Sequence, residues 1–185
     1  MVLMVCLAAS VNAQMSGTRF GVKAGANFSN VNVEGTDADI KATSGLHLGV
    51  LAHVHVTDRF AFQPELVYSM QGAKSEFAGE DSKLKLHYIN IPVLGQVMFG
   101  DGFRLQTGPQ VGFLLSAKEE DEDVKEDFNK IDFSWSFGAS YVTSTGIGFD
   151  ARYNLGLSNI SESDEVKARN RVFQVGIFYL FGGTK

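Results

Sequence analysis

Residues 131–141 read IDFSWSFGASY, and large apolar side chains alternate with small or polar ones along the whole stretch. One parity carries Ile131, Phe133, Trp135, Phe137, Ala139 and Tyr141, and the other carries Asp132, Ser134, Ser136, Gly138 and Ser140. Because successive side chains of a strand point to opposite faces, this pattern predicts a strand with one apolar face and one polar face. The inward face decides the protein class: a soluble barrel buries its aromatic face, whereas a barrel in a bilayer turns that face outward.

The same two-residue period recurs in other segments, which predicts eight strands with no helical pattern between them. With the opening stretch, the strands are expected at 18–29, 46–56, 60–71, 84–99, 103–116, 131–141, 147–158 and 171–181. Only 84–99 is irregular, because Leu84 and Leu86 have one parity and the apolar residues from Ile89 onward have the other. We expect a β-bulge near Tyr88, since one extra residue would keep both sets on the same face.

The connections between these strands alternate in length. Short turns are expected at 57–59, 100–102 and 142–146, and long polar connections at 30–45, 72–83, 117–130 and 159–170. Short turns at one end and long loops at the other are typical of outer-membrane barrels. A strand of about ten residues, rising ~3.3 Å per residue and tilted by ~40°, spans ~25 Å, which matches the apolar band of such barrels.

The charged residues of the strands fall on the polar face, except Arg171 at the start of the last segment. With the bulge included, the rest of the apolar face of the eight segments has none, and the polar face carries Lys23, Glu65, Arg104, Asp132, Asp150 and Arg152. A Lys or Arg that faces lipid at mid-depth costs roughly 2–4 kcal/mol, so a lipid-facing surface should exclude both. The polar face is also rich in Gly, which suits the interior of a small barrel that side chains must fill.

These faces predict an all-β fold, an eight-stranded antiparallel up-and-down transmembrane β-barrel with meander topology. Most of the 15 Phe and the single Trp lie on the apolar face and would overfill so small an interior. The alternative is a soluble lipocalin-like barrel, whose solvent face would need more Lys and Glu and fewer Gly. The aromatic residues expected to face lipid, many of them near strand ends as in interfacial girdles, are Phe20, Phe28, Phe60, Phe62, Phe103, Phe113, Phe133, Trp135, Phe137, Tyr141, Phe149, Tyr153, Phe173, Tyr179 and Phe181.

Inside the barrel, the six charged residues are expected to form a network with Glu65 and Arg152 as central partners. Pairing 131–141 with 147–158 across their turn is expected to place Asp150 opposite Gly138 and Arg152 opposite Ser136. Structural packing of a closed lumen is the favoured interpretation. A narrow ion path through the same side chains is the functional alternative.

The first residues, MVLMVCLAASVNAQ, form a short apolar run that ends in Val11-Asn12-Ala13. Small or aliphatic residues at the first and third places of that triplet fit a secretory cleavage site, which predicts a signal peptide at 1–13 and a barrel domain at 14–185. The run lacks the basic residue that normally begins a signal, which is consistent with a truncated or misassigned start. Cys6 would leave with the signal, and a net charge of −5 does not favour a nucleic-acid partner.

With the strands assigned, the chain resembles the small outer-membrane β-barrel domain of Bacteroidetes-type bacteria, called PorT-like or "porin family". The matching stretches are FGVKAGANFSNV (20–31), FQPELVYSMQGAK (62–74), YINIPVLGQ (88–96), LQTGPQVGFLLSAK (105–118), GFDARYNLGLSNI (148–160) and NRVFQVGIFYLF (170–181). The resemblance implies an eight-stranded barrel that the barrel-assembly machinery inserts into the outer membrane of a Gram-negative envelope. It implies no particular chemistry.

Candidate binding groups lie in an acidic run and in a histidine-rich strand. The run KEEDEDVKEDFNK at 118–130 could contact divalent cations, or bridge through them to lipopolysaccharide, but it lacks the ligand spacing and turn Gly of a calcium loop. The candidate cation contacts are Glu119, Glu120, Asp121, Glu122 and Asp123. His47, His53 and His55 share the polar face of 46–56, where a hydrogen bond between Gln63 and His53 is expected rather than a metal site.

No spacing of His, Ser and a carboxylate suggests a catalytic triad, so we expect a non-enzyme without metal or cofactor. The predicted protein is a monomer in the cell outer membrane, with periplasmic termini and four long extracellular loops. Its expected role is structural or binding, through those loops, with outer-membrane lipid and lipopolysaccharide as partners. The alternatives are a narrow, porin-like channel for ions or small solutes, and an accessory factor in protein secretion or envelope assembly.

Overall fold

The computed structural model describes residues 17–33, 40–77, 80–100, 102–119, 122–161 and 168–182. Within these ranges a two-residue strand β6 (Glu122–Asp123) and a short 3-10 helix η3 (Lys125–Asp127) lie between two of the long strands. No helix in the described part of the chain is long and apolar enough to cross a membrane. The long strands are β1 (Thr18–Val33), β2 (Ile40–His55), β3 (Phe60–Phe77), β4 (Glu80–Phe99), β5 (Phe103–Glu119), β7 (Ile131–Val142), β8 (Ile147–Gly156) and β9 (Ala168–Leu180).

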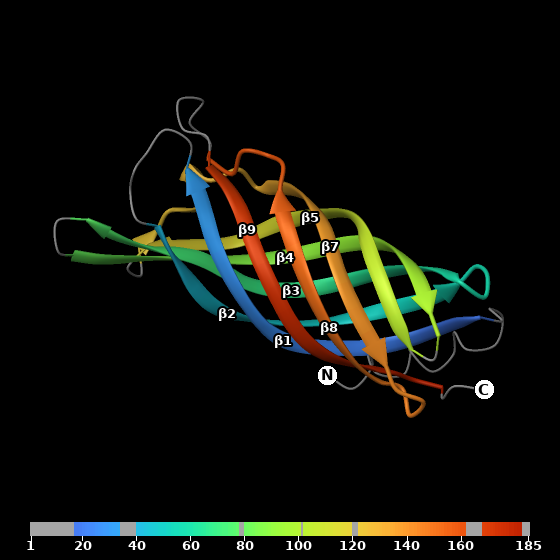
Figure 1. The fold of residues 1–185 in the computed structure, drawn as a ribbon. Helices are drawn as coiled ribbons and strands as arrows, with labels where there is room; N and C mark the ends of the chain where they lie inside the picture. Colours follow the sequence, from blue (N-terminus) through green and yellow to red (C-terminus); the bar gives the residue numbers. More distant parts are fainter. Residues whose placement is uncertain are drawn as a thin grey trace, which may run out of the picture.

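These eight long strands close into an antiparallel barrel. Each pairs with the next along the chain, and β1 pairs with β9, so the sheet has no free edge among them (Figure 1). The predicted fold class and meander order are therefore confirmed. We call the end at which β2–β3, β4–β5 and β7–β8 are joined the turn end, and the opposite end the loop end. β1 begins and β9 finishes at the turn end, where the Phe181 amide donates to the Phe20 carbonyl (2.8 Å).

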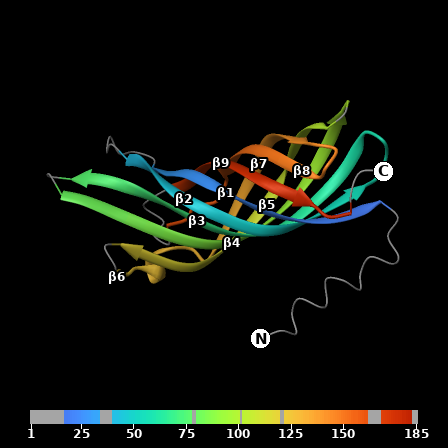
Figure 2. The same ribbon diagram turned by 90° about the horizontal axis from the view of Figure 1, so that it is seen from below.

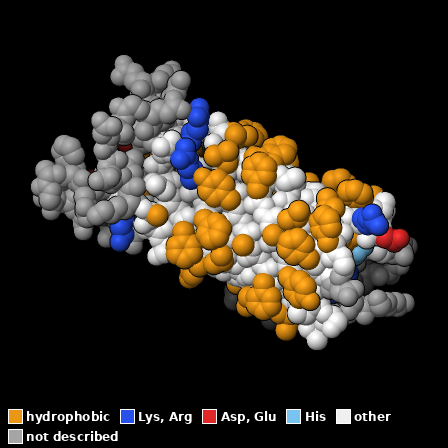
Figure 3. All heavy atoms as spheres, in the orientation of Figure 1, with side chains coloured by type: hydrophobic (Ala, Val, Ile, Leu, Met, Phe, Trp, Pro, Cys, Tyr) orange, Lys and Arg blue, Asp and Glu red, His pale blue; other side chains and the backbone are white. Residues whose placement is uncertain are grey.

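The polar parity of the strands points inward and the apolar parity points outward. In β7, for example, Ser136 is fully buried whereas Phe137 is 51% exposed. Figure 3 shows this surface as a band of hydrophobic side chains between charged groups at the two ends. Such an inside-out arrangement is favourable only where lipid, not water, surrounds the barrel.

The β-bulge expected near Tyr88 is present, but the expected change of face in β4 is wrong. Its burial alternates without a change of face, so Leu86 (0% exposed) and Tyr88 (1%) point into the barrel while Ile91 (39%) points outward. The irregularity near Tyr88 lies in the pairing with β5, where His87 pairs with Ser116 and Tyr88 with Leu114. The extra residue is therefore in β5, and the β4 leucines keep their inward direction.

Those inward residues belong to one of two apolar clusters inside the barrel. The loop-end plug contains Val31, Ala73, Leu86, Tyr88, Leu114, Ala117, Ile160 and Ala168, against which Leu84, Val124 and Phe128 pack. The turn-end plug contains Leu51, Val142, Phe178 and Leu180. Apolar layers thus lie near both ends of the interior, most of the buried polar side chains lie between them, and Arg104 and His53 lie near the turn end.

The connections at the loop end are shorter than the sequence suggests. β1 continues to Val33, β2 starts at Ile40, and β3 and β4 continue to Phe77 and Glu80. Most of 30–45 and 72–83 is therefore strand, and Figure 2 shows the β3–β4 hairpin extending beyond the rest of the barrel. Antiparallel backbone pairing continues past the apolar band since it needs no apolar side chains. The proposed signal peptide at 1–13 lies outside the described residues.

Candidate functional site

Four charged side chains from three strands meet in the middle of the lumen. Glu65 on β3 accepts two hydrogen bonds from Arg152 on β8, with Nη2–Oε1 at 2.8 Å and Nη1–Oε2 at 3.0 Å. Lys23 on β1 lies between the two carboxylates, 3.3 Å from Glu65 Oε2 and 3.1 Å from Asp150 Oδ2. All four side chains are at most 2% exposed. We call these residues the central network.

The register between β7 and β8 gives the central network its space. Arg152 lies opposite Gly138, and Asp150 lies opposite Ser140. A Cβ at Gly138 would be 2.6 Å from the Ala151 oxygen and 3.2 Å from the Arg152 Cα, so a larger residue could not face the arginine there. The expected register, with Asp150 opposite Gly138, is wrong by two residues.

The turn between these strands explains the difference. The Thr143 amide donates to the Ile147 carbonyl (2.8 Å), and Gly146 has a φ of +91°, which a residue with a side chain rarely adopts. The centre of the turn therefore lies one residue further along the chain than expected. As a result, each residue of β7 pairs with a β8 residue two positions later than expected.

Neutral polar side chains extend the central network through Gln63 and form a separate polar group around Asn27, and neither set was identified as site residues from the sequence. On one side, Gln63 Nε2 donates to Glu65 (2.8 Å), and Gln96 Nε2 donates to both Gln63 (3.0 Å) and Gln106 (2.9 Å). On the other side, Asn27 donates to Ser69 (2.9 Å). These Gln and Asn residues all lie on the polar face of their strands, which the sequence already shows. Because buried amides need hydrogen-bond partners, that position could have predicted a hydrogen-bonded group inside the barrel.

Two of the six predicted network charges lie elsewhere in the lumen. Arg104 is near the turn end, with Nη1 3.3 Å from His53 Nδ1. Asp132 is near the loop end, where it accepts hydrogen bonds from Ser158 (2.8 Å) and Asn170 (3.0 Å). The inward charges thus form three groups, and only the central network combines both signs at ion-pair distance among the described residues.

The central network carries two cations and two anions, so its net charge is zero. Taking these groups out of water is costly, and the hydrogen bonds and opposite charges offset that cost only while every partner is present. The network joins β1, β3 and β8 across the lumen.

The histidines have hydrogen-bond or ring contacts, and the rings of His53 and His55 meet edge to face with centroids 4.5 Å apart. His47 and His53 are buried, and His47 Nδ1 lies 2.8 Å from Asn27 Oδ1, whereas His55 is exposed at the turn end. His87 faces outward and lies 2.6 Å from the Tyr68 hydroxyl. In the described ranges, no group of three or more His, Cys, Asp or Glu side chains is placed to hold a metal ion.

The acidic run folds back at the loop end as the short β5–β6 hairpin. Lys118 pairs with Asp123 and Glu119 with Glu122 in this hairpin. Glu120 and Asp121 lie outside the described residues. The Asp123 carboxylate accepts a hydrogen bond from the Lys125 amide (3.0 Å), so at least one of the candidate cation contacts serves the local fold.

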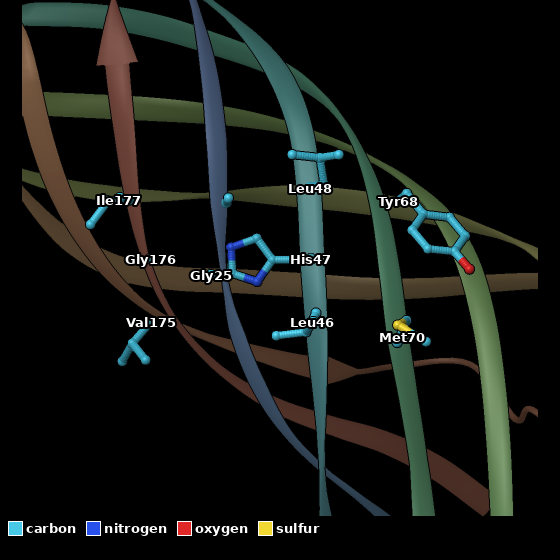
Figure 4. Close-up of a pocket in the computed structure, with 10 residues that line it drawn as sticks. Gly25, Leu46, His47, Leu48, Tyr68, Met70, Val175, Gly176 and Ile177 are labelled. Carbon is cyan, nitrogen blue, oxygen red and sulfur yellow. The ribbon is translucent and has the colours of Figure 1, made fainter.

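The outer surface carries every aromatic residue predicted to face lipid, each at least 36% exposed. Trp135 has its indole N–H satisfied on this surface by the Thr107 hydroxyl (2.7 Å), which removes the cost of placing an unpaired donor in lipid. A hollow of about 800 Å³ lies where small residues of β1, such as Ala24, stand between the larger Leu46 and Leu48 of β2 and Ile177 of β9 (Figure 4). It is open and almost wholly apolar, as expected of a surface that lipid chains cover.

Solved structures with a similar fold are small outer-membrane barrels. Neisserial surface protein A matches with a TM-score of 0.60 at 16% identity, over 89% of this chain and 99% of that one. Ail, the attachment invasion locus protein of Yersinia pestis, solved in complex with the heparin analogue sucrose octasulfate, matches with a TM-score of 0.56 at 15% identity, over 90% of this chain and 100% of that one. At such identities the likeness concerns the fold.

Comparison with curated protein sequences finds no significant match. The sequence profile of a family described as "Outer membrane protein beta-barrel domain" matches residues 12–162. The PorT-like subtype stays a prediction. The match covers most of the closed barrel and agrees with its inside-out surface: this chain belongs to the outer membrane protein β-barrel domain family and is an outer-membrane protein.

Proposed function

We propose that the protein is a non-conducting, monomeric outer-membrane scaffold that presents its loop-end connections to the outside of the cell. The closed lumen carries this proposal. The side chains of the central network are at most 2% exposed, and an apolar plug lies on either side of it. A channel would need a continuous water-filled path through these layers.

The proposed topology places the turn end in the periplasm, after export by a signal at 1–13 and insertion by the barrel-assembly machinery. Its support is the difference between the two ends, since family-type barrels have short periplasmic turns. Lys74, Lys118 and Arg171 are exposed at the loop end, where they would meet the phosphates of lipopolysaccharide in this orientation. Outer-membrane lipid is the proposed partner of the aromatic surface.

We propose no catalytic role. A lipid-modifying enzyme would need a nucleophile, a base and an orienting group on the lipid side. On the outward strand surface, His87 is hydrogen-bonded to the Tyr68 hydroxyl, which is a phenol and not the Ser of a hydrolase triad. Binding or structural roles fit this surface better.

Planar-bilayer recording of the purified, folded barrel tests the proposal. We expect no stable conductance above the bare membrane. The matched control is the double variant Glu65→Ala with Arg152→Ala, which keeps the network neutral and removes side-chain volume from its centre. Brief openings of this variant alone would show that the central network is part of the seal. Stable, ion-selective conductance of the natural chain would contradict the proposal and favour the narrow-channel alternative.

A further inference from the structure

A cavity of about 360 Å³ opens at the turn end, separate from the central network. Its lining includes Arg19, His55, Asp58, Arg104 and Val142. Figure 3 shows Lys or Arg, Asp or Glu, and His side chains close together at this end of one face. We call this cavity the turn-end cavity, and its charge balance is unlike that of the rest of the lumen.

Arg104 is the unusual member of the lining. It is only 6% exposed, and its Nη1 lies 3.3 Å from Nδ1 of His53. Within the described residues, no carboxylate lies within 4.0 Å of its guanidinium. Arg152, in the same lumen, has two hydrogen bonds to Glu65. Burying a cation is costly unless an anion compensates its charge, so Arg104 is a suitable anchor for a bound anion.

Arg19 adds a second cation to the same cavity. Its guanidinium donates to the carbonyl oxygens of Leu180 (3.2 Å) and Phe181 (3.4 Å), which orient it but do not neutralise its charge. The described carboxylate of the lining is Asp58, which is exposed in the β2–β3 turn. Two arginines against one aspartate leave a net charge of +1 among the described lining residues; Asp101, between the lining residues Gly100 and Gly102, lies outside the described residues.

The walls strengthen the attraction for an anion. Val142 contributes to the cavity and also to the turn-end plug, so one side of the cavity is apolar. Apolar walls keep the local dielectric constant low, and charge–charge attraction is stronger there than in water. The planar guanidinium presents donors in a fork that matches the two oxygens of a carboxylate or a phosphate.

We infer that the turn-end cavity binds a compact oxyanion, a phosphate or carboxylate group, with Arg104 as its anchor and Arg19 as its second cation. The site does not depend on the lumen being closed, and it exists whichever side of the membrane the turn end faces. Asp58 would weaken the binding by like-charge repulsion, so removal of its charge should strengthen the binding of the anion.

Isothermal titration of the folded barrel with inorganic phosphate, in a non-ionic detergent at low salt, tests the site. We expect saturable, one-site heat. Arg104→Gln should weaken the affinity about ten-fold or more, because a charge-assisted pair is replaced by a neutral contact. Asp58→Asn should strengthen it. Lys130→Gln removes a positive charge at an exposed loop-end position that has no proposed anion contact, and it should leave the affinity unchanged.

A parallel titration with acetate separates the two ligand sources. Heat with phosphate alone would assign a phosphate group, and heat with both anions, each lost in Arg104→Gln, would assign a general oxyanion site. Because Arg104→Gln could also fail to fold, amide NMR shifts of the natural chain provide an independent readout. Phosphate should shift the Gly100, Gly102 and Arg104 amides first. Absence of saturable heat, shifts spread evenly over the barrel, or equal weakening in Lys130→Gln would overturn the inference.

Discussion

Replacing Glu65 by Gln is expected to destabilise the folded barrel by about 3–5 kcal/mol, the usual cost of breaking a buried ion pair by removing one partner. Glu65 accepts hydrogen bonds at 2.8, 3.0 and 3.3 Å from Arg152 and Lys23. Gln keeps one acceptor oxygen and nearly the same volume, so the loss is mainly electrostatic. The two cations would then share the single carboxylate of Asp150, 3.1 Å from Lys23 and 3.6 Å from Arg152.

The measurement is urea unfolding in lipid vesicles, followed by tryptophan fluorescence and by the gel shift between folded and unfolded barrel. Adding Lys23→Met to Glu65→Gln restores a neutral interior with Asp150 and Arg152 as the remaining pair. The double variant should therefore be more stable than Glu65→Gln alone, by about 1 kcal/mol or more. Glu122→Gln makes the same chemical change at an exposed position and should stay within about 0.5 kcal/mol of the natural chain.

Two results would refute this reasoning. If Glu65→Gln were as stable as Glu122→Gln, the central network would not brace the barrel. If adding Lys23→Met lowered the free energy of unfolding by as much again as Glu65→Gln alone, the charges would act independently. Neutrality of the central network would then not be what stabilises it.

Five further substitutions, which make three tests, examine other parts of the barrel by the same unfolding measurement. Phe137→Arg, at the middle of the outer face, should cost about 2–4 kcal/mol, whereas Phe181→Arg, just after β9, should cost about 0–1 kcal/mol; equal costs would contradict a lipid-facing position for Phe137 at mid-depth. Gly176→Ala should cost about 1–3 kcal/mol, because its Cβ would lie 2.9 Å from a backbone oxygen, whereas at Gly95 the nearest atom is 3.7 Å away and Ala should be tolerated. Leu86→Ala should cost about 2–5 kcal/mol if it leaves a cavity in the loop-end plug, and a neutral result would show that the plug is not packed.

The strands and their faces could be predicted because a two-residue period leaves little freedom. If the aromatic face of each strand meets lipid, the two-residue period places Glu65 and Arg152 on the inward face. Both lie near the middle of their strands, so their side chains can meet inside the barrel. Register could not be predicted so well. The geometry of one turn, with Gly146 at positive φ, moved Arg152 to the position opposite Gly138.

The loop-end plug was missed for a different reason. Leu84 and Leu86 have the opposite parity to the other apolar residues of β4. A β-bulge in β4 would turn both leucines outward, and this was the expectation from the sequence. The structure keeps them inside, because near the loop end the barrel is closed by its own apolar contacts. The isolation of Arg104 could not be seen at all, since cross-barrel neighbours depend on how far the strands are staggered around the barrel.

The proposals for this protein depend on which face of the strands meets lipid, and the single Trp of the chain lies on that face. The direct measurement is the fluorescence of Trp135 in vesicles whose lipid chains carry bromine at defined depths. Strong quenching by the brominated chains, with little quenching by aqueous iodide, is the predicted result. Quenching by iodide with no response to the brominated lipids would contradict the inside-out barrel.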